Sequence, residues 1–532
     1  MNVFQRKLAP ALGAPAARHP RRAVPRLGWL LAALGIIALA LMVGFVVALG
    51  SPQLTIIVAG LLFLLPVVAL VGTKDLLPIM FVYIFLIQGL ADSYFHLRLA
   101  IWMGSGMAFL FLCRTLMELS NIKALRQEKA LPSFGVTAIV CAAGLYLLFF
   151  FFMLALGQHT LGQLISSVRF SVPMFGVLLA MYCFKLNERR FQLLWTLIFV
   201  VTFVQIPPVL YQHFIQTEWD DVVGTFGFGL SPVLVLFSLV AMVYAMARWS
   251  YGLMSAKMLA LILVVGLHNI LMGEVKAVLF WLPLCFMLIM RKRILKNVFA
   301  FVGYILLIGV FMVGTVTAYK AMYWGEKGTS GSTIEEKISR RGGYFFNPYE
   351  INHKTGEVSR IASLYLWYVD PIPGVMERLV GYGPGASAAS ESNGLGVVAT
   401  RYRPLRINST AFSSLLWDVG ILGTLSYVLI LIFGVLTAWR FVRRNRGSPA
   451  HMAIVDTSMV TLVLLFTTMI YNRTVVDSIV VQLLLFFCLG SIVQCVRFGK
   501  VDAEALADDA GKNPAPLQPY YSAQRRQGYS TS

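Results

Sequence analysis

Residues 134–156 read FGVTAIVCAAGLYLLFFFFMLAL, an apolar run of 23 residues without a charge. A helix of this length, rising 1.5 Å per residue, crosses the hydrocarbon core of a bilayer, which is about 30 Å thick. Similar runs recur along the chain, in which 58% of the 532 residues are hydrophobic. In lipid, a helix satisfies every backbone polar group within its own segment. The sequence therefore predicts an all-α polytopic membrane protein.

We expect about 12–14 transmembrane helices from the recurrence of such runs. The predicted spans cover 27–49, 53–72, 76–91, 99–117, 134–156, 170–184, 191–210, 230–247, 257–273, 277–290, 298–318, 411–439, 453–471 and 478–496. The first span is longer than the apolar core of a signal peptide and is followed by no convincing cleavage site, so we expect it to be an anchor.

These spans divide the chain into five predicted parts. Residues 1–26 form a basic cytoplasmic arm, and 27–318 hold helices 1–11. A large polar loop covers 319–410, and 411–497 hold helices 12–14. The polar, proline-containing segment 498–532 is predicted to be a disordered cytoplasmic tail.

The distribution of charge predicts the orientation. If the N-terminus lies inside, 29 of the 44 Lys and Arg and nine of the 24 Asp and Glu fall on the inner side, which then carries +20. The outer side carries a net charge of about zero, the asymmetry that the positive-inside rule describes. The net charge of +20 thus reports topology, and we expect no nucleic-acid partner because the basic residues are scattered over many short loops.

The loop 319–410 carries eleven Lys and Arg and eight Asp and Glu in an otherwise apolar chain. The residues STIEE at 332–336 form a capping box, which predicts a short helix to about residue 341. Amphipathic patterning predicts further helices at 359–369 and 375–380. The turn GYGPG at 381–385 contains three glycines, which allow unusual backbone angles and close approach of a ligand.

Several functional classes are disfavoured by what the sequence lacks. The six cysteines lie in or beside predicted spans and show no metal-ligand spacing, and no Walker loop or dinucleotide fingerprint is present. We therefore expect no metal and no cofactor. No strong internal repeat is visible, which disfavours a transporter built from inverted repeats.

Four basic residues outside the loop fall on the predicted outer side, against the charge bias: Arg98, Arg169, Lys276 and Arg473. Each lies at or near the end of a span, where a cation is a candidate for function. Arginine suits a bidentate grip on phosphate, which indicates an outer-leaflet pyrophosphate as partner. The alternative is that each cation pairs with one of the nearby acids: Asp92, Glu218, Asp220, Asp221, Glu274 or Asp477.

A general base on this side would be a carboxylate or a neutral histidine. The candidates are Asp92, His96, His159, His213, Asp220, Asp221, Glu274 and His353. Each histidine also has a simple alternative, which is that of a solvated loop residue.

Several stretches together resemble the bacterial O-antigen polymerase and O-antigen ligase superfamily. GTFG at 224–227 precedes a span, and GEVKA at 273–277 falls where many members have a short Ser-Arg-Gly turn. Arg360 with its following helix comes next, and then the turn 381–385, which is similar to the family's G-x-G-x-G. LLWDVGILG at 415–423 looks like the family's entry into the span after the loop. The resemblance covers about residues 200–440.

The resemblance implies a type-C glycosyltransferase-like fold in the bacterial inner membrane, with a large periplasmic loop and both termini cytoplasmic. It implies metal-independent transfer of a glycan from undecaprenyl pyrophosphate to another lipid-linked repeat unit, with a flippase and a chain-length regulator as further partners. The candidate catalytic residues are Arg360, Lys276, Glu274 and Arg169. The candidate substrate-binding residues are Arg98, Gly381, Gly383, Gly385, Arg401, Arg403, Arg406 and Arg473.

One departure from the family favours polymerase over ligase. Many members carry His-Asn about ten residues before the glycine that matches Gly420, and here these positions are Ser409 and Thr410. In ligases that histidine is a candidate catalytic residue, so its absence disfavours transfer to lipid A core or protein and leaves the base unassigned. A flippase of lipid-linked sugars and a non-catalytic partner in a synthesis complex are the remaining alternatives.

Overall fold

The computed structural model describes residue 44 and residues 71–119, 133–157, 159–216, 222–227, 229–273, 275, 277–323, 347–390, 394–444 and 447–512. From residue 70 onward the chain forms one unit, to which the following description refers. The predicted arm, most of the first two predicted spans and the predicted capping-box helix lie outside the described residues.

The first half of the unit is helical. Its elements are α3 (Thr73–Val82), the π-helix η1 (Tyr83–Ile87), α4 (Gln88–Phe95), α5 (Leu99–Leu119), α7 (Phe134–Leu156), α8 (Leu161–Ser171), α9 (Phe175–Cys183), α10 (Glu188–Val204), α11 (Ile206–Phe214), α12 (Ser231–Ser250), α13 (Ala256–Met272), α14 (Val278–Ile294) and α15 (Val298–Tyr323).

The second half contains the loop and the last helices. Its elements are β1 (Ile351–Asn352), β2 (Glu357–Val358), α17 (Arg360–Val369), α18 (Val375–Val380), β3 (Ala389–Ser390), β4 (Gly394–Leu395), α19 (Val397–Arg401), α20 (Ala411–Arg444), α21 (Pro449–Tyr471), α22 (Thr474–Asp477) and α23 (Ile479–Lys512). The strands form two antiparallel hairpins, β1 with β2 and β3 with β4.

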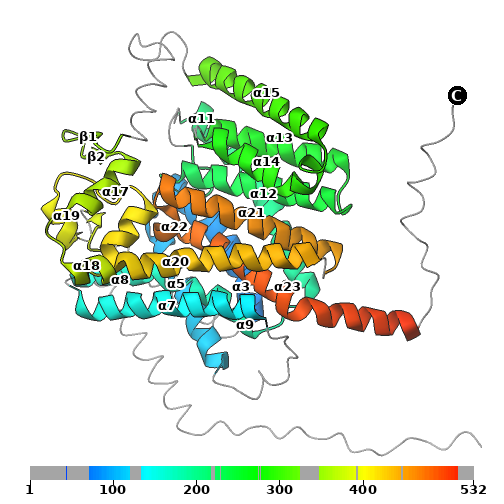
Figure 1. Ribbon diagram of the computed structural model, residues 1–532, viewed down its shortest axis with the longest axis horizontal. Coiled ribbons are helices and arrows are strands. Elements are labelled where there is room, and N and C mark those ends of the chain that lie inside the picture. Colours follow the sequence, from blue (N-terminus) through cyan, green and yellow to red (C-terminus); the bar gives the residue numbers. More distant parts are fainter. Residues whose placement is uncertain are drawn as a thin grey trace, which may run out of the picture. The chain divides into compact units, whose positions relative to one another are not determined.

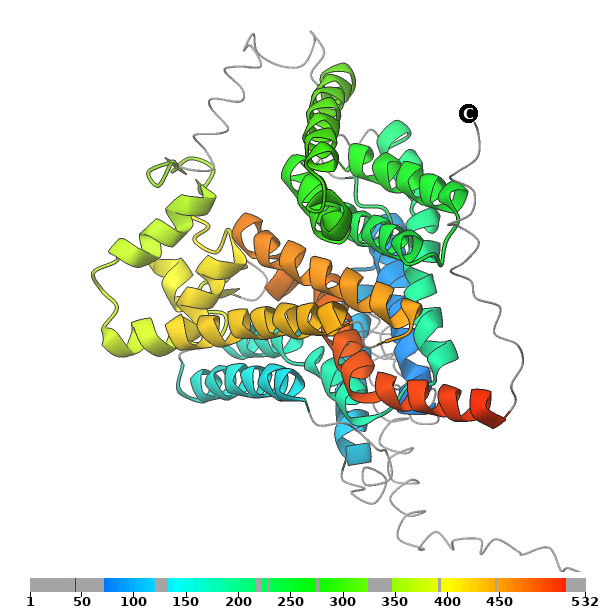
Figure 2. The same ribbon diagram turned by 45° about the vertical axis from the view of Figure 1, so that its right-hand side comes forward.

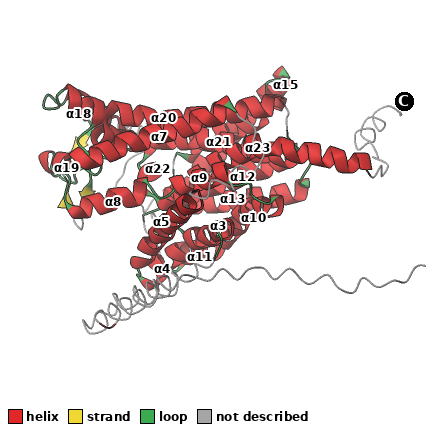
Figure 3. Ribbon diagram, turned by 90° about the horizontal axis from the view of Figure 1, so that it is seen from below, coloured by secondary structure: helices red, strands yellow, loops and turns green. Residues whose placement is uncertain are grey.

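Ten helical segments of the described chain are long and apolar enough to cross a membrane, and Ala256–Met272 is a shorter apolar helix. This confirms the prediction of a mostly helical, multi-pass membrane protein (Figure 3). Among these segments, α12, α21 and the first part of α23 are the most deeply buried and form the centre of the bundle. α20 packs along α7 on one side and α21 on the other (Figure 1).

Two predicted spans are each built from two helices. The span predicted at 170–184 begins earlier, at Gly162, and is broken between α8 and α9. The break lies at Pro173, which lacks an N–H donor and disfavours helical angles at the preceding residue. α8 was not predicted as part of this span because its polar residues interrupt the apolar run. In the same way, α10 and α11 meet at Gln205, before two prolines.

The first part of the predicted tail, up to Lys512, is helical. α23 continues to Lys512, past residue 498, where we expected disorder to begin. Residues 503–507 read AEALA, a run of strong helix formers that extends the last spanning helix. The prediction of disorder used the polarity of this segment and did not take its high helix propensity into account.

The described part of the loop is folded around a small core of its own. α17 and α18 confirm the two predicted helices, and the Ser359 hydroxyl caps α17 by accepting from the Ala362 N–H. The buried core residues are Val358, Ala362, Ala386, Val398, Leu405, Ile407 and Trp417. Since Trp417 belongs to α20, this core fixes the loop elements at the start of that helix. Figure 1 and Figure 2 show the ribbons of α17, α18 and α19 at that end of α20.

Candidate functional site

A cavity of ≈ 580 Å³ lies where the start of α20 meets α7, α8, α22 and the glycine turn of the loop. Its wall is both polar and aromatic. The lining residues are Arg98, Trp102, Tyr146, Phe150, Gln163, Ser166, Ser167, Arg169, Phe170, Ser171, Pro384, Gly385, Ser387, Ala388, Gly394, Asn408, Ser414, Leu415, Asp418, Val419, Arg473, Val476 and Asp477. This volume falls within the range of small-molecule sites, about 300–1,000 Å³.

Three of the four cations predicted from topology line this cavity: Arg98, Arg169 and Arg473. They come from the start of α5, from α8 and from the start of α22, so segments far apart in the sequence supply them. The fourth, Lys276, lies outside the described residues, as does Glu274. The structure thus brings the three arginines together, and their contact with phosphate stays a prediction.

Arg169 is held firmly by its neighbours. Its guanidinium carbon lies 3.9 Å from the centre of the Trp102 ring and 4.6 Å from that of Phe170. Its Nε donates to the Ser105 hydroxyl at 2.8 Å. Within the described chain no acid lies at ion-pair distance from Arg169. A guanidinium fixed by stacking and not neutralised by an acid is well suited to bind an anion.

Arg473 differs because it has an acidic partner in the same cavity. Its Nε lies 2.6 Å from Oδ2 of Asp477, one turn further along α22. Burial raises the pKa of the Asp477 carboxyl above its usual range, and the charge of Arg473 opposes that rise. Arg98 is exposed at the rim. Three arginines therefore face two aspartates, Asp418 and Asp477, which leaves the cavity with net positive charge.

The glycine turn at 381–385 packs closely against neighbouring elements and also contributes to the lining of the cavity. Gly381, Gly383 and Gly385 have φ of 84°, 110° and 87°, angles that residues with a side chain rarely adopt. A Cβ on Gly381 would meet the Asp418 carbonyl oxygen at 2.5 Å, and one on Gly385 would meet the Ser167 hydroxyl at 2.7 Å. Of the three, only Gly385 lines the cavity.

Asp418 locks this turn in place. Its Oδ2 accepts from the Gly385 N–H at 3.1 Å, and its Oδ1 accepts from the Ser387 N–H at 2.8 Å. Asp418 was not among the site residues predicted from the sequence. The signal that could have found it is an ionisable residue inside an apolar span, just after the loop.

The remaining arginines predicted for the site do not line the cavity. Arg360 stands over the ring of Tyr471 at 5.8 Å and is not part of the lining. Arg401 forms an ion pair with Asp370 at 3.0 Å. Arg403 and Arg406 are exposed. Arg401, Arg403 and Arg406 are close in sequence, but their side chains do not gather at this cavity.

Arg401→Ala is expected to destabilise the loop by about 3 kcal/mol, because it leaves Asp370 buried without its ion partner. The Asp370 side chain is 1% exposed in the native fold, so its carboxylate depends on the guanidinium and not on solvent. Thermal unfolding of the purified protein and trypsin digestion of the loop measure the effect. The exposed Arg403→Ala is the matched control, and equal stability of the two variants would contradict a structural role for Arg401.

The GTFG turn at 224–227 is a buried irregular segment and is separate from the cavity. The Gln212 side chain accepts from the Val223 and Gly224 N–H groups and donates to the Gly224 carbonyl. The Gln205 side chain accepts from the Thr225 N–H and donates to its hydroxyl. Irregular backbone between membrane helices needs hydrogen-bond partners for its N–H and C=O groups. The two glutamines supply them here, so the turn has a structural role.

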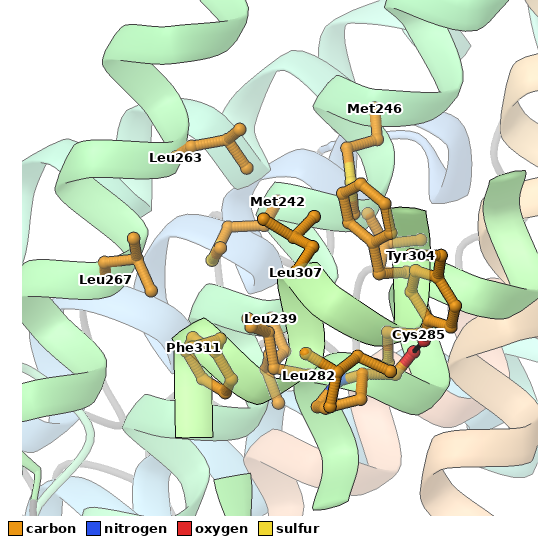
Figure 4. A pocket seen from close by; sticks show the side chains of 14 residues that line it. Leu239, Met242, Met246, Leu263, Leu267, Leu282, Cys285, Tyr304, Leu307 and Phe311 are labelled. Carbon is orange, nitrogen blue, oxygen red and sulfur yellow. Dashed lines mark hydrogen bonds between the residues drawn. The ribbon is translucent and has the colours of Figure 1, made fainter. Parts of the chain in front are cut away.

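A second cavity, of ≈ 180 Å³, lies among α12, α13, α14 and α15 and is lined by apolar side chains (Figure 4). Its one phenol, on Tyr304, donates to the Pro283 carbonyl at 2.6 Å. No charged residue lines it, so it offers no group for acid–base or phosphate chemistry.

Within the described ranges, no group of three or more His, Cys, Asp or Glu side chains could hold a metal ion. A scan against protein-family models and a search of curated proteins find no match to the chain.

Proposed function

We propose that this protein is a polymerase of a bacterial surface polysaccharide or exopolysaccharide. It would join oligosaccharide repeat units carried on undecaprenyl pyrophosphate, at the periplasmic side of the inner membrane. The observation that carries the proposal is the convergence of Arg98, Arg169 and Arg473 on one cavity between spanning helices and the large loop.

The cavity suits a ligand that is anionic at one part and apolar or sugar-like at another. Guanidinium groups bind pyrophosphate oxygens through paired N–H donors. The aromatic residues Trp102 and Phe150 supply flat apolar surface beside the arginines. Serine, asparagine and glutamine side chains in the same wall offer hydrogen bonds to sugar hydroxyls.

The charge distribution supports placing this cavity outside. It lies at the Ala411 end of α20, whereas Arg443 and Arg444 end that helix. Under the positive-inside rule, the basic end is cytoplasmic and the cavity faces the periplasm. A lipid-linked donor would then bring its own activated leaving group, and no cytoplasmic nucleotide sugar would be needed.

In this reaction the arginines would act on the leaving group. As the glycosidic bond to pyrophosphate breaks, negative charge grows on the phosphate oxygens. Fixed cations in a site shielded from water stabilise that charge more strongly than solvent does. Arg169 is the best placed, since Trp102 and Ser105 already hold its guanidinium.

A deletion strain tests the proposal through the glycan that remains on the carrier lipid. Loss of a polymerase is expected to leave single repeat units on undecaprenyl pyrophosphate and no long chains, as measured by mass spectrometry of the extracted lipid. Long chains accumulating on the carrier would identify a ligase instead. Reconstituted protein that moves labelled carrier lipid across a bilayer without lengthening glycan would identify a flippase.

A further inference from the structure

The cavity holds two carboxylates, and the described residues that line it include no histidine. The described general-base candidates selected from the sequence do not line it: Asp92, His96, His159, His213 and His353. Of these, His159 packs against Gly383 in the glycine turn, and its Nε2 lies 2.7 Å from the Leu154 carbonyl oxygen. Asp220, Asp221 and Glu274 lie outside the described residues. A group that receives a proton from a bound sugar must reach the cavity, so Asp418 and Asp477 are the two to compare.

Asp418 is already engaged in holding the fold. Both of its oxygens accept backbone N–H groups, from Gly385 and from Ser387. A carboxylate in this position fixes the wall of the cavity. Using it as a base would weaken the hydrogen bonds that hold the glycine turn.

Asp477 is placed differently. It ends the four-residue helix α22, and its side chain is 34% exposed. Arg473 contacts Oδ2, one of its two oxygens. α22 packs against α8, which carries Arg169, so the carboxylate and the anion-binding arginines share one cavity.

We propose that Asp477 is the general base of the reaction, which rests on the proposed polymerase function. The Asp477 carboxylate accepts the proton of the acceptor sugar hydroxyl. The hydroxyl oxygen forms the new bond to the anomeric carbon of the donor glycan, and the bond from that carbon to the pyrophosphate oxygen breaks. The electron pair leaves with undecaprenyl pyrophosphate, and the proton on Asp477 passes to solvent.

The pH dependence follows from the surroundings of the carboxyl. The Asp477 side chain is 34% exposed, yet the protein atoms around its carboxyl reduce its hydration and raise its pKa. The charge of Arg473, the residue before α22, opposes that rise but is the smaller effect. The other charged groups of the cavity are Arg98 and Arg169 from α5 and α8, and Asp418 from α20. A base must be ionised, so the rate falls as the pH drops through this raised pKa. The fall therefore begins at higher pH than for an ordinary aspartate, whose pKa is about 3.9.

The test uses the full chain in proteoliposomes, with carrier-linked repeat units extracted from the deletion strain as substrate. Asp477→Asn is expected to reduce kcat by about 10²-fold, to change KM little and to remove the acid limb of the pH profile. Binding of radiolabelled undecaprenyl pyrophosphate should persist. Asp477→Glu, which keeps a carboxylate, should recover part of the rate. The exposed Glu357→Gln is the matched control.

The possible results distinguish failure of the base assignment from failure of the polymerase function. If the wild type lengthens glycan and Asp477→Asn keeps kcat within about 3-fold, the base assignment fails and the polymerase function stands. If binding of undecaprenyl pyrophosphate is lost in parallel with the rate, Asp477 serves to position Arg473, and the base assignment again fails. If wild-type protein lengthens no glycan, the polymerase function fails, and the base assignment with it.

Discussion

Arg169→Ala is expected to reduce glycan lengthening by about 10³-fold, the upper range for loss of one preorganised group that stabilises transition-state charge. The guanidinium is stacked on Trp102 at 3.9 Å and is hydrogen-bonded to Ser105, so it needs little rearrangement when charge develops on the leaving group. In cells, the variant should leave short carrier-linked glycan and no long chains. Gel analysis of chain length, with an immunoblot for the protein, measures the outcome.

Two further variants show whether charge or shape matters at this position. Arg169→Lys keeps the charge but loses the paired donors and the stacked plane, so its rate should fall between those of wild type and alanine variant. Arg403→Ala removes an exposed arginine that does not line the cavity, and it should leave chain length unchanged. Normal chain length in a well-expressed Arg169→Ala strain would rule out Arg169 as a catalytic residue.

The cations of the cavity could be predicted from the sequence because they break the charge pattern of the other short loops. Arg98, Arg169 and Arg473 stood out against the positive-inside bias, and the structure places all three in one cavity. A charge pattern alone does not distinguish these three arginines from Arg401 in the loop. The partner of Arg401 is Asp370, 31 residues away, and only the folded loop brings the two together.

Predictions from local sequence succeeded where local forces decide the structure. The helix after Ser359 follows from its cap and its amphipathic pattern, and the structure confirms it. The glycine turn at 381–385 was predicted to allow close approach of a ligand, but the groups that approach Gly381 are backbone atoms of Asp418 and Gly420. Such contacts depend on where α20 lies relative to the loop, which no local pattern encodes.

This contact makes Gly381→Ala a strongly damaging substitution for the site. Gly381 has φ 84° and ψ −173°, a region that is essentially restricted to glycine and costs other residues about 1–3 kcal/mol. The new Cβ would also lie 2.5 Å from the Asp418 carbonyl oxygen and 2.6 Å from the Gly420 nitrogen. These are backbone atoms, so relief requires α18 and α20 to separate, which adds about 1–3 kcal/mol.

The same separation should reach the cavity, since Asp418 holds Gly385 and Ser387 from the adjoining part of α20. We therefore expect Gly381→Ala to lower the unfolding temperature, to expose the loop to trypsin and to abolish long glycan. Gly374→Ala is the matched control, because Gly374 has φ −69° and its new Cβ would meet only the flexible Glu377 side chain. If Gly381→Ala matched this control in unfolding temperature and chain length, the close packing of the glycine turn on α20 could not be what shapes the cavity.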